Sequence, residues 1–271
     1  MREPTLLVDP VKRIWHCREL LWQLTVHDVR SRYRGSAMGL LWSIVTPLLM
    51  LAVYTAFFNE VFGARLGPSA QTAPQFALAL FIGMLLHGLL SECMTRAPAL
   101  IVSQPNLVKK VVFPLEILPI VSLGSALIHL LAGMAIWLGF YCVAEGMPPP
   151  TAPLIVVVLL PFTLMTLGIG WILAALGVYL RDLAHVTPIL SSVLLFASPV
   201  FYPLSMLREP FRSVVAASPL TLPIEQARAV LLTGHLPDWP ALLAYTLVAV
   251  LVAALGLLWF AGTSKGFADV V

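Results

Sequence analysis

Arg30-Ser31-Arg32-Tyr33-Arg34-Gly35 is a basic stretch that lies shortly before an apolar run, residues 40–62. The run has 23 residues and carries no charge until Glu60. At 1.5 Å per helical residue it would measure about 34 Å, which is enough to cross the roughly 30 Å hydrocarbon core of a bilayer. A basic cluster beside a spanning helix usually stays in the cytoplasm. The stretch therefore predicts a membrane protein, its first span and its orientation.

The composition supports a membrane protein over a soluble domain. Of the 271 residues, 59% are hydrophobic and only 11% are charged, against roughly 25% charged residues in soluble domains. The three cysteines, Cys17, Cys93 and Cys142, lie far apart, so we interpret them as small apolar residues and expect neither a zinc site nor a disulfide framework. The first 40 residues are too charged for a cleavable signal, so the first span should remain in the mature protein.

Residues 9–34 precede the first span and are predicted to form an amphipathic helix. Six apolar residues recur at spacings of three, four and seven, which places them along one helical face: Val11, Trp15, Trp22, Val26, Val29 and Tyr33. Such a helix lies in the membrane interface, with tryptophan at headgroup level and the cations near anionic lipid. The alternative is a helix packed on its own protein.

Five more apolar segments follow, and we predict six spans in all: residues 40–62, 75–90, 114–144, 154–180, 186–202 and 239–261. An even number of spans places both termini on the same side. The segments predicted inside hold twelve lysines and arginines, against four in the outer segments, so both termini are expected in the cytoplasm. The fold class is therefore all-α integral membrane, with residues 1–271 as a single domain.

We find no motif for catalysis or nucleotide binding. HExxH, GxSxG and GxxxxGK are absent from the sequence, and the scattered histidines predict no metal site. His87 and His129 are interpreted as hydrogen-bonded packing residues, with proton carriers as the alternative. Glu92 and Glu116 lie near predicted cytoplasmic span ends, where we expect structural ion pairs with nearby cations. We expect a chain with no catalytic residue and no cofactor of its own.

Three regions are candidates for function. Residues 96–112 form a basic inner loop that predicts either a short surface helix for docking a partner or a loop that only sets topology. Residues 204–234 resemble two short helices bent around prolines, which would close the outer end of a path; an ordinary amphipathic outer loop competes. The aromatic residues Tyr54, Phe58, Phe196, Phe201 and Tyr202 would suit a sugar path, with helix packing and an interfacial belt as the alternative.

The order of motifs resembles ABC-2-type permeases that export polysaccharide. Leu20-Leu21-Trp22, Arg32-Tyr33-Arg34-Gly35-Ser36, Gly39-Leu40-Leu41-Trp42-Ser43 and Pro47-Leu48 are similar to the opening of that family. Lys109-Lys110-Val111, Phe113-Pro114-Leu115-Glu116 and Pro119 resemble its cytoplasmic loop and third span, and later landmarks are Arg181-Asp182-Leu183, Ser218-Pro219-Leu220 and Phe267-Ala268-Asp269-Val270. The likeness covers essentially the whole chain. Ser218 departs from it, since asparagine is common there.

The resemblance implies an ABC-2 (type V exporter) fold in the bacterial inner membrane. It implies a homodimer with two copies of an ATP-binding subunit that carries the ATP and Mg, and no nucleic-acid partner. The cargo would be a lipid-linked glycan, most directly O-antigen on undecaprenyl diphosphate, with capsule and teichoic acid as related cargoes. Rival readings are a drug or lipid exporter, a membrane glycosyl or acyl transferase, and a structural scaffold.

The resemblance also implies roles for particular segments. Residues 9–34 become the interface helix, 96–112 the coupling helix and 204–234 the outer gate helices. Contacts to the ATP-binding subunit are then expected at Asn106, Lys109, Lys110, Arg181 and Asp182. The arginines Arg30, Arg32 and Arg34 become candidates for meeting the carrier diphosphate, because arginine suits phosphate oxygens; setting the topology would also explain them.

Overall fold

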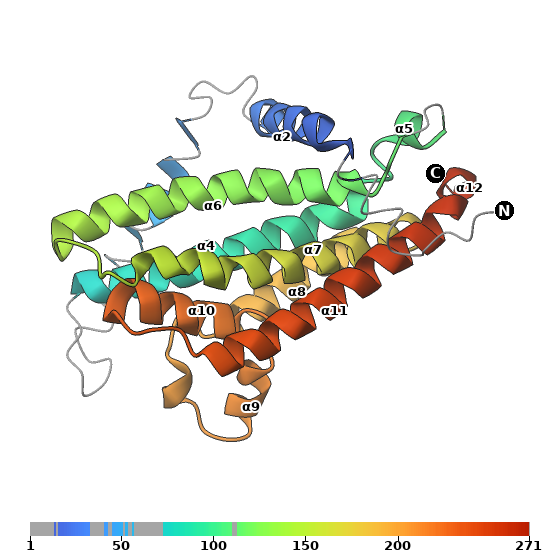
Figure 1. Cartoon of the computed structure of the whole chain (residues 1–271). Coiled ribbons are helices and arrows are strands. Elements are labelled where there is room, and N and C mark those ends of the chain that lie inside the picture. The colour runs from blue at the N-terminus through green and yellow to red at the C-terminus, as the bar shows by residue number, and fades with distance from the viewer. Residues whose placement is uncertain are drawn as a thin grey trace.

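The computed structural model describes residue 14 and residues 16–32, 41–42, 45–50, 52–53, 56, 73–109 and 113–270. Figure 1 shows an elongated bundle of long helices, which are α4 (Ala73–Arg96), α6 (Ile117–Ala144), α7 (Ile155–Tyr179) and α11 (Trp239–Thr263). Shorter α-helices are α2 (Arg18–Arg32), α5 (Pro105–Lys109), α8 (Leu183–Phe196), α9 (Phe211–Ala216), α10 (Thr221–Arg228) and α12 (Phe267–Val270). Short turns of other helix types are η2 (Ala97–Ala99), η3 (Ala152–Leu154), η4 (Leu204–Met206), η5 (Ala229–Thr233) and η6 (Ser264–Gly266).

Four helical segments in the described residues are long and apolar enough to cross a membrane: Pro74–Ala99, Ile117–Ala144, Ala152–Tyr179 and Trp239–Val270. They correspond to the predicted second, third, fourth and sixth spans, and the all-α prediction is confirmed for this part of the chain. Most of the predicted first span lies outside the described residues, as do Arg34, Tyr54, Phe58 and Lys110. The count of six spans therefore stays a prediction.

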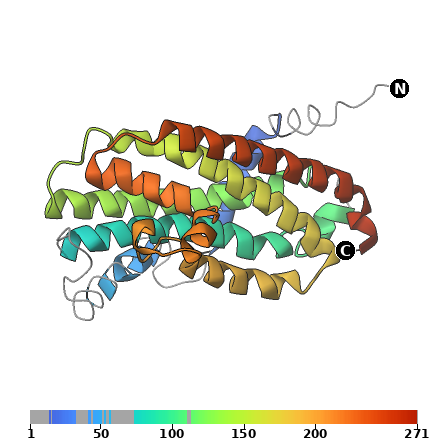
Figure 2. The same cartoon turned by 90° about the horizontal axis from the view of Figure 1, so that it is seen from below.

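The predicted fifth span, residues 186–202, is wrong in its bounds. The helix α8 runs from Leu183 to Phe196 and has 14 residues, or about 21 Å at 1.5 Å per residue, which is less than a bilayer core. The chain turns after Phe196 because Pro199 and Pro203 each lack an amide donor and disfavour helix in the residue before them. Phe201 and Tyr202 thus lie in a turn beyond the helix. Figure 2 shows α8 and α11 at opposite edges of the bundle.

The second span is longer than predicted. The prediction ends this span at residue 90, but α4 continues to Arg96. The polar side chains are satisfied within the helix: the Thr95 hydroxyl donates to the carbonyl of Ser91 at 2.8 Å, and Arg96 Nη1 lies 3.4 Å from Glu92 Oε1. Polar residues end a span only where their groups need water, and here they have internal partners.

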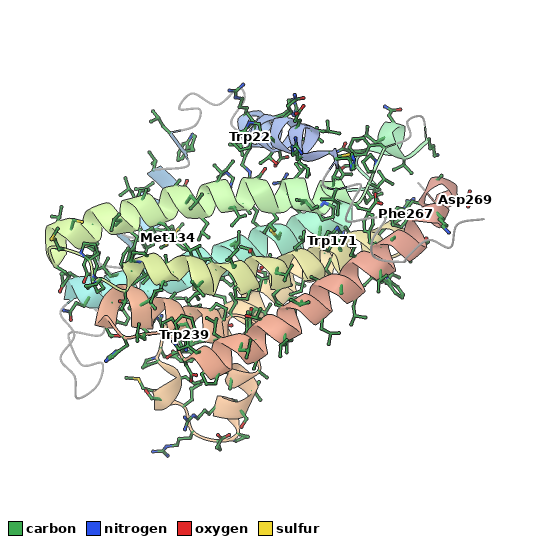
Figure 3. All side chains as sticks on the ribbon, viewed as in Figure 1. Trp22, Met134, Trp171, Trp239, Phe267 and Asp269 are labelled. Atoms are coloured by element: carbon green, nitrogen blue, oxygen red, sulfur yellow. The ribbon has the colours of Figure 1, made fainter. Side chains whose placement is uncertain are left out.

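Glycines set the packing of α7 on α11. A Cβ atom at Gly168 would lie 2.7 Å from the amide nitrogen of Ala253, and one at Gly256 would lie 2.5 Å from the carbonyl oxygen of Gly168. These distances are too short for any side chain, so the two backbones meet directly, as they do where small residues bring membrane helices together. Deeper in the bundle the Trp171 indole (labelled in Figure 3) donates to the carbonyl of Glu116 at 2.9 Å.

Candidate functional site

The helix α2 lies against α6 near the end of the bundle that carries α5 and α12 (Figure 1). Thr25 and Val29 are buried in this contact. A Cβ atom at Gly124 of α6 would lie 2.9 Å from Cγ2 of Thr25, so the glycine is what allows the close approach. Trp22 (Figure 3) keeps 67% of its surface exposed. The protein thus covers only part of the predicted apolar face, which leaves Trp22 available to lipid.

Asp28 connects α2 to two spanning helices. Its carboxylate accepts two hydrogen bonds from Arg96 Nη2, at 2.7 and 2.8 Å, and one from the Ser125 hydroxyl at 2.7 Å. Burial alone would raise the pKa of Asp28, but the hydrogen bonds from Arg96 and Ser125 and the charges of Arg96 and Arg32 outweigh it and hold the pKa below its usual value. Asp28 is therefore ionised wherever the cell's pH is near neutral. We call the Asp28, Arg96 and Ser125 contact the latch.

A second ionic contact lies beside the latch. Glu92 Oε1 lies 2.9 Å from Arg32 Nη2 on α2, and Glu92 Oε2 lies 3.0 Å from His129 Nδ1 on α6. His129 Nδ1 is also 2.9 Å from Arg32 Nη1. The predictions that Glu92 forms ion pairs and that His129 is a hydrogen-bonded residue are confirmed. The same prediction for His87 is also confirmed, since its Nε2 lies 3.0 Å from the carbonyl oxygen of Ser191. The ion pair predicted for Glu116 stays a prediction.

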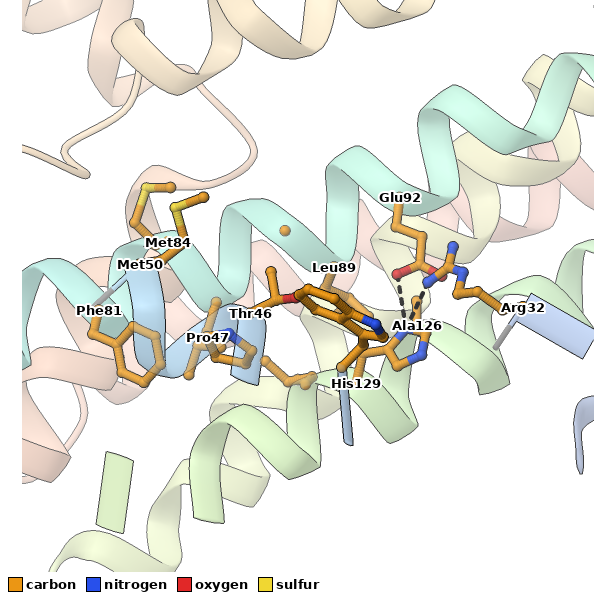
Figure 4. Close-up of a pocket in the computed structure, with 14 residues that line it drawn as sticks. Arg32, Thr46, Pro47, Met50, Phe81, Met84, Leu89, Glu92, Ala126 and His129 are labelled. Carbon is orange, nitrogen blue, oxygen red and sulfur yellow. Dashed lines mark hydrogen bonds and ion pairs between the residues drawn. The ribbon is translucent and has the colours of Figure 1, made fainter. Parts of the chain in front are cut away.

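A cavity of about 340 Å³ opens next to these charges (Figure 4). Arg32, Glu92 and His129 lie at one end of it, and Phe81, Met84 and Met50 lie toward the other. The remaining wall is almost entirely apolar and comes from α4, α6 and the segment around Pro47. Sequence reasoning singled out Glu92 and His129 one at a time. It missed that these two residues, 37 apart in sequence, meet each other and Arg32 of α2.

The predicted partner contacts lie at one end of the bundle. Asn106 and Lys109 are exposed on α5, and Arg181 and Asp182 are exposed between α7 and α8. Figure 1 places α5 and the end of α7 near α12, at the same end. The predicted coupling helix over residues 96–112 is shorter in the structure, where α5 has five residues. The described part of this region offers exposed polar groups to a partner.

The predicted outer segment contains the two short helices α9 and α10, as expected for residues 204–234. Its main anchor is Arg228, which sequence reasoning missed. The guanidinium donates to the carbonyls of Pro199 at 2.6 Å, Val200 at 2.7 Å and Ala79 at 3.1 Å. It thus ties α10 to α4 and to the turn after α8. The signal was available, because an arginine inside an apolar stretch must find internal acceptors.

The candidate glycan-path aromatics are only partly described. Phe196 and Phe201 stack with their ring centroids 5.7 Å apart, and the Tyr202 hydroxyl donates to the carbonyl of Phe196. Phe196 is 67% exposed. Packing accounts for these contacts, while the exposed face of Phe196 leaves room for the glycan reading. Within the described residues no group of three or more metal-ligating side chains comes together.

Comparisons with known proteins agree with one another. The family model described as ABC-2 type transporter matches residues 19–232. The chain is 31% identical over 259 residues to the O-antigen export system permease protein RfbA of Myxococcus xanthus, covering 95% of each chain. It is 26% identical over 220 residues to an RfbA of Klebsiella pneumoniae, covering 80% of this chain and 82% of that one. The Polysialic acid transport protein KpsM of Escherichia coli is 21% identical over 235 residues, which cover 84% of this chain and 88% of KpsM.

Proposed function

Since this chain belongs to the ABC-2 type transporter family, we propose that it is the membrane permease of an ATP-driven exporter that moves O-antigen on undecaprenyl diphosphate across the inner membrane. The observation that carries the proposal is the 31% identity with an O-antigen export permease over 95% of both chains. The KpsM likeness supports the broader class of polysaccharide export. Two copies of this chain would form the path, with both termini in the cytoplasm.

The ATP-binding partner would dock at the end of the bundle that carries α5. Asn106 and Lys109 on α5, Lys110 beyond it, and Arg181 with Asp182 between α7 and α8 are the proposed contacts. Support comes from the exposure and shared location of the four described residues among them, because a surface that transmits force to a membrane protein needs polar groups at a cytoplasmic end. The sequence holds no phosphate-binding loop of its own, so an ATP-driven exporter built on this chain would take its work from such a partner.

The carrier diphosphate would meet the basic end of α2. Arg30 is exposed and has no ion pair among the described residues, whereas Arg32 is engaged with Glu92. Arg30 and Arg34 therefore become the main proposed contacts, and Arg32 joins them only by leaving Glu92. Arginine can bind phosphate oxygens through two parallel hydrogen bonds, which a diphosphate satisfies twice.

The test is co-purification. A tagged chain, gently solubilised from its native membrane, is expected to bring a near-equimolar ATP-binding subunit. The double variant Asn106→Ala with Lys109→Glu should lose that subunit, while Arg212→Glu, an exposed charge on α9 far from α5, should keep it. If the chain purifies alone from several detergents, the proposal of an ATP-driven exporter fails, and a membrane enzyme becomes the better reading.

A further inference from the structure

The cavity beside the latch has one charged end and one long apolar end, which matches the headgroup and acyl chain of a lipid. Along α4 it extends from Glu92 to Phe81, which is eleven residues or about 16 Å at 1.5 Å per residue. That is roughly half of the about 30 Å hydrocarbon core, the depth of one leaflet. The charged end lies near the end of α4, close to the expected membrane surface, and the apolar end lies deeper. The volume of about 340 Å³ falls in the usual range for small-molecule sites.

Arg32 has donors to offer at the charged end. Its side chain is 37% exposed, the most exposed of the three charged or ionisable side chains there. Within the described part of the chain its guanidinium contacts Glu92 through Nη2 and His129 through Nη1. A guanidinium has five N–H groups, so a bound anion can be added without removing the ion pair with Glu92.

His129 Nδ1 lies between two neighbours and cannot bond both at once. Its Nδ1 lies within hydrogen-bond distance of both Glu92 Oε2 and Arg32 Nη1. A ring nitrogen either donates a hydrogen or accepts one, so Nδ1 can satisfy only one of the two at a time. When Nδ1 donates to Glu92, the Nη1 group of Arg32 faces no acceptor at that atom. An oxygen from a ligand would then complete its hydrogen bonding.

The charge balance selects the ligand. The two acidic and two basic side chains there cancel: Asp28 and Arg32 on α2, and Glu92 and Arg96 on α4. A phosphodiester adds one negative charge to this neutral set. A diphosphate adds at least two negative charges against apolar walls, which is more costly. The carrier of the proposed cargo therefore fits this cavity poorly.

From these observations we infer that the cavity between α2, α4, α6 and the segment around Pro47 holds a membrane phospholipid, with its phosphodiester on Arg32 and one acyl chain along α4 toward Phe81. The lipid would bind the permease itself and would not be cargo. It would complete the contact between the interface helix and the spans. The inference holds whatever glycan the protein exports.

Gly88 offers a clean way to test the inference. It lines the cavity, and a Cβ atom there would meet nothing within 4 Å. Gly88→Leu therefore adds a side chain that starts in open space and reduces the cavity. Gly139 on α6 is equally open and does not line the cavity, so Gly139→Leu is the matched control. For the headgroup, Arg32→Gln is compared with Arg30→Gln, which removes an exposed charge one helical half-turn away.

The measurement is binding of phosphatidylglycerol to the delipidated full chain, in complex with any subunits that accompany it, followed by native mass spectrometry. We expect the wild type, Gly139→Leu and Arg30→Gln to bind one tightly held lipid per chain. Arg32→Gln should bind it about tenfold more weakly or worse, which is the usual effect of losing a hydrogen bond to a charged group. Gly88→Leu should also weaken binding, because the leucine side chain takes the space of the acyl chain. Diacylglycerol with the same chains should bind as weakly as phosphatidylglycerol does to Arg32→Gln.

Three results would overturn the inference. If Gly88→Leu keeps wild-type binding, the lipid lies elsewhere. If Arg30→Gln weakens binding as much as Arg32→Gln does, the lipid responds only to the general positive charge of α2. If a polyprenyl diphosphate displaces phosphatidylglycerol from the wild type, and Gly88→Leu weakens its binding too, the cavity belongs to the cargo carrier.

Discussion

The latch predicts that Asp28→Ala releases α2 from the bundle while the spans stay folded. Asp28 accepts three hydrogen bonds, two from Arg96 and one from Ser125. Both charged side chains are about a quarter exposed, at 26% and 27%. An exposed ion pair contributes about 0–1 kcal/mol and breaking a buried one costs about 3–5 kcal/mol. We therefore expect the cost of opening α2 to fall by about 1–3 kcal/mol.

Hydrogen exchange of the full chain in detergent or nanodiscs measures this opening directly. A loss of about 1–3 kcal/mol corresponds to roughly 5- to 150-fold faster exchange of the α2 amides. The amides of α7 and α11 should not change, because α2 packs mainly on α6. Glu19→Ala is the control, since Glu19 is the exposed acidic residue in the first turn of α2, where a favourable helix-dipole interaction is worth only about 0.3–1 kcal/mol.

A double-mutant cycle separates the pair from its surroundings. Arg96→Ala also removes a contact with Glu92, so the informative quantity is the coupling between Asp28→Ala and Arg96→Ala. We expect the second substitution to have a smaller effect on α2 exchange once the first is present. If the two effects simply add, or if Glu19→Ala speeds exchange as much as Asp28→Ala, the latch does not hold α2.

Three further predictions concern packing, the outer segment and pH. Gly168→Leu should lower the melting temperature or abolish assembly, since overpacking costs about 1–3 kcal/mol or more, whereas Gly262→Leu, with nothing within 4 Å, should not; equal effects would contradict the backbone contact of α7 with α11. Arg228→Lys should speed amide exchange in α10 and the following turn while Arg212→Lys leaves it unchanged. The compact ammonium lacks the planar fork that reaches three separate carbonyls, and an unsatisfied carbonyl costs about 1–3 kcal/mol. Similar exchange in both variants would show that Arg228 is no anchor. The pKa of Asp28 lies below its usual value, so the stabilisation of α2 docking by its carboxylate is present above about pH 4 and is lost as the pH falls through the lower folded pKa. Exchange of the α2 amides, corrected for intrinsic rates, should therefore show no Asp28 titration between about pH 5 and 8. A step in that range that Asp28→Ala removes would refute the assignment.

The positions of the spans were predictable because a spanning helix requires a long apolar run without charges. The predicted bounds of α6, α7 and α11 agree with the structure to within a few residues. The ends were harder. Ser91 to Arg96 look like a loop by composition, and only their internal hydrogen bonds make them helix. The end of α8 depended on Pro199, which shortens the helix although the apolar run continues past it.

The site was predictable only in its parts. Glu92 and His129 stand out because charged and ionisable groups near hydrocarbon need partners, but nothing local says which partner each one takes. Asp28 and Arg96 are 68 residues apart, and their pairing depends on where α2 docks on α6. That docking depends in turn on Gly124, which looks like any other glycine in an apolar run. Pairings of this kind need the fold.

The position of Arg96 joins the proposed coupling surface to the interface helix. Arg96 ends α4 and immediately precedes η2, and α5 begins at Pro105. The connection between them is firmly seated: Ala97, Pro98 and Ile101 are buried, and a Cβ atom at Gly177 of α7 would lie 2.3 Å from the carbonyl oxygen of Pro98. A displacement of α5 by a partner would therefore reach the end of α4 through packed backbone instead of being absorbed in a loose loop. Arg96 would then pass it to α2 through Asp28 and to the cavity beside the latch through Glu92. On this reasoning the latch is where force from the partner meets the part of the protein that faces the membrane.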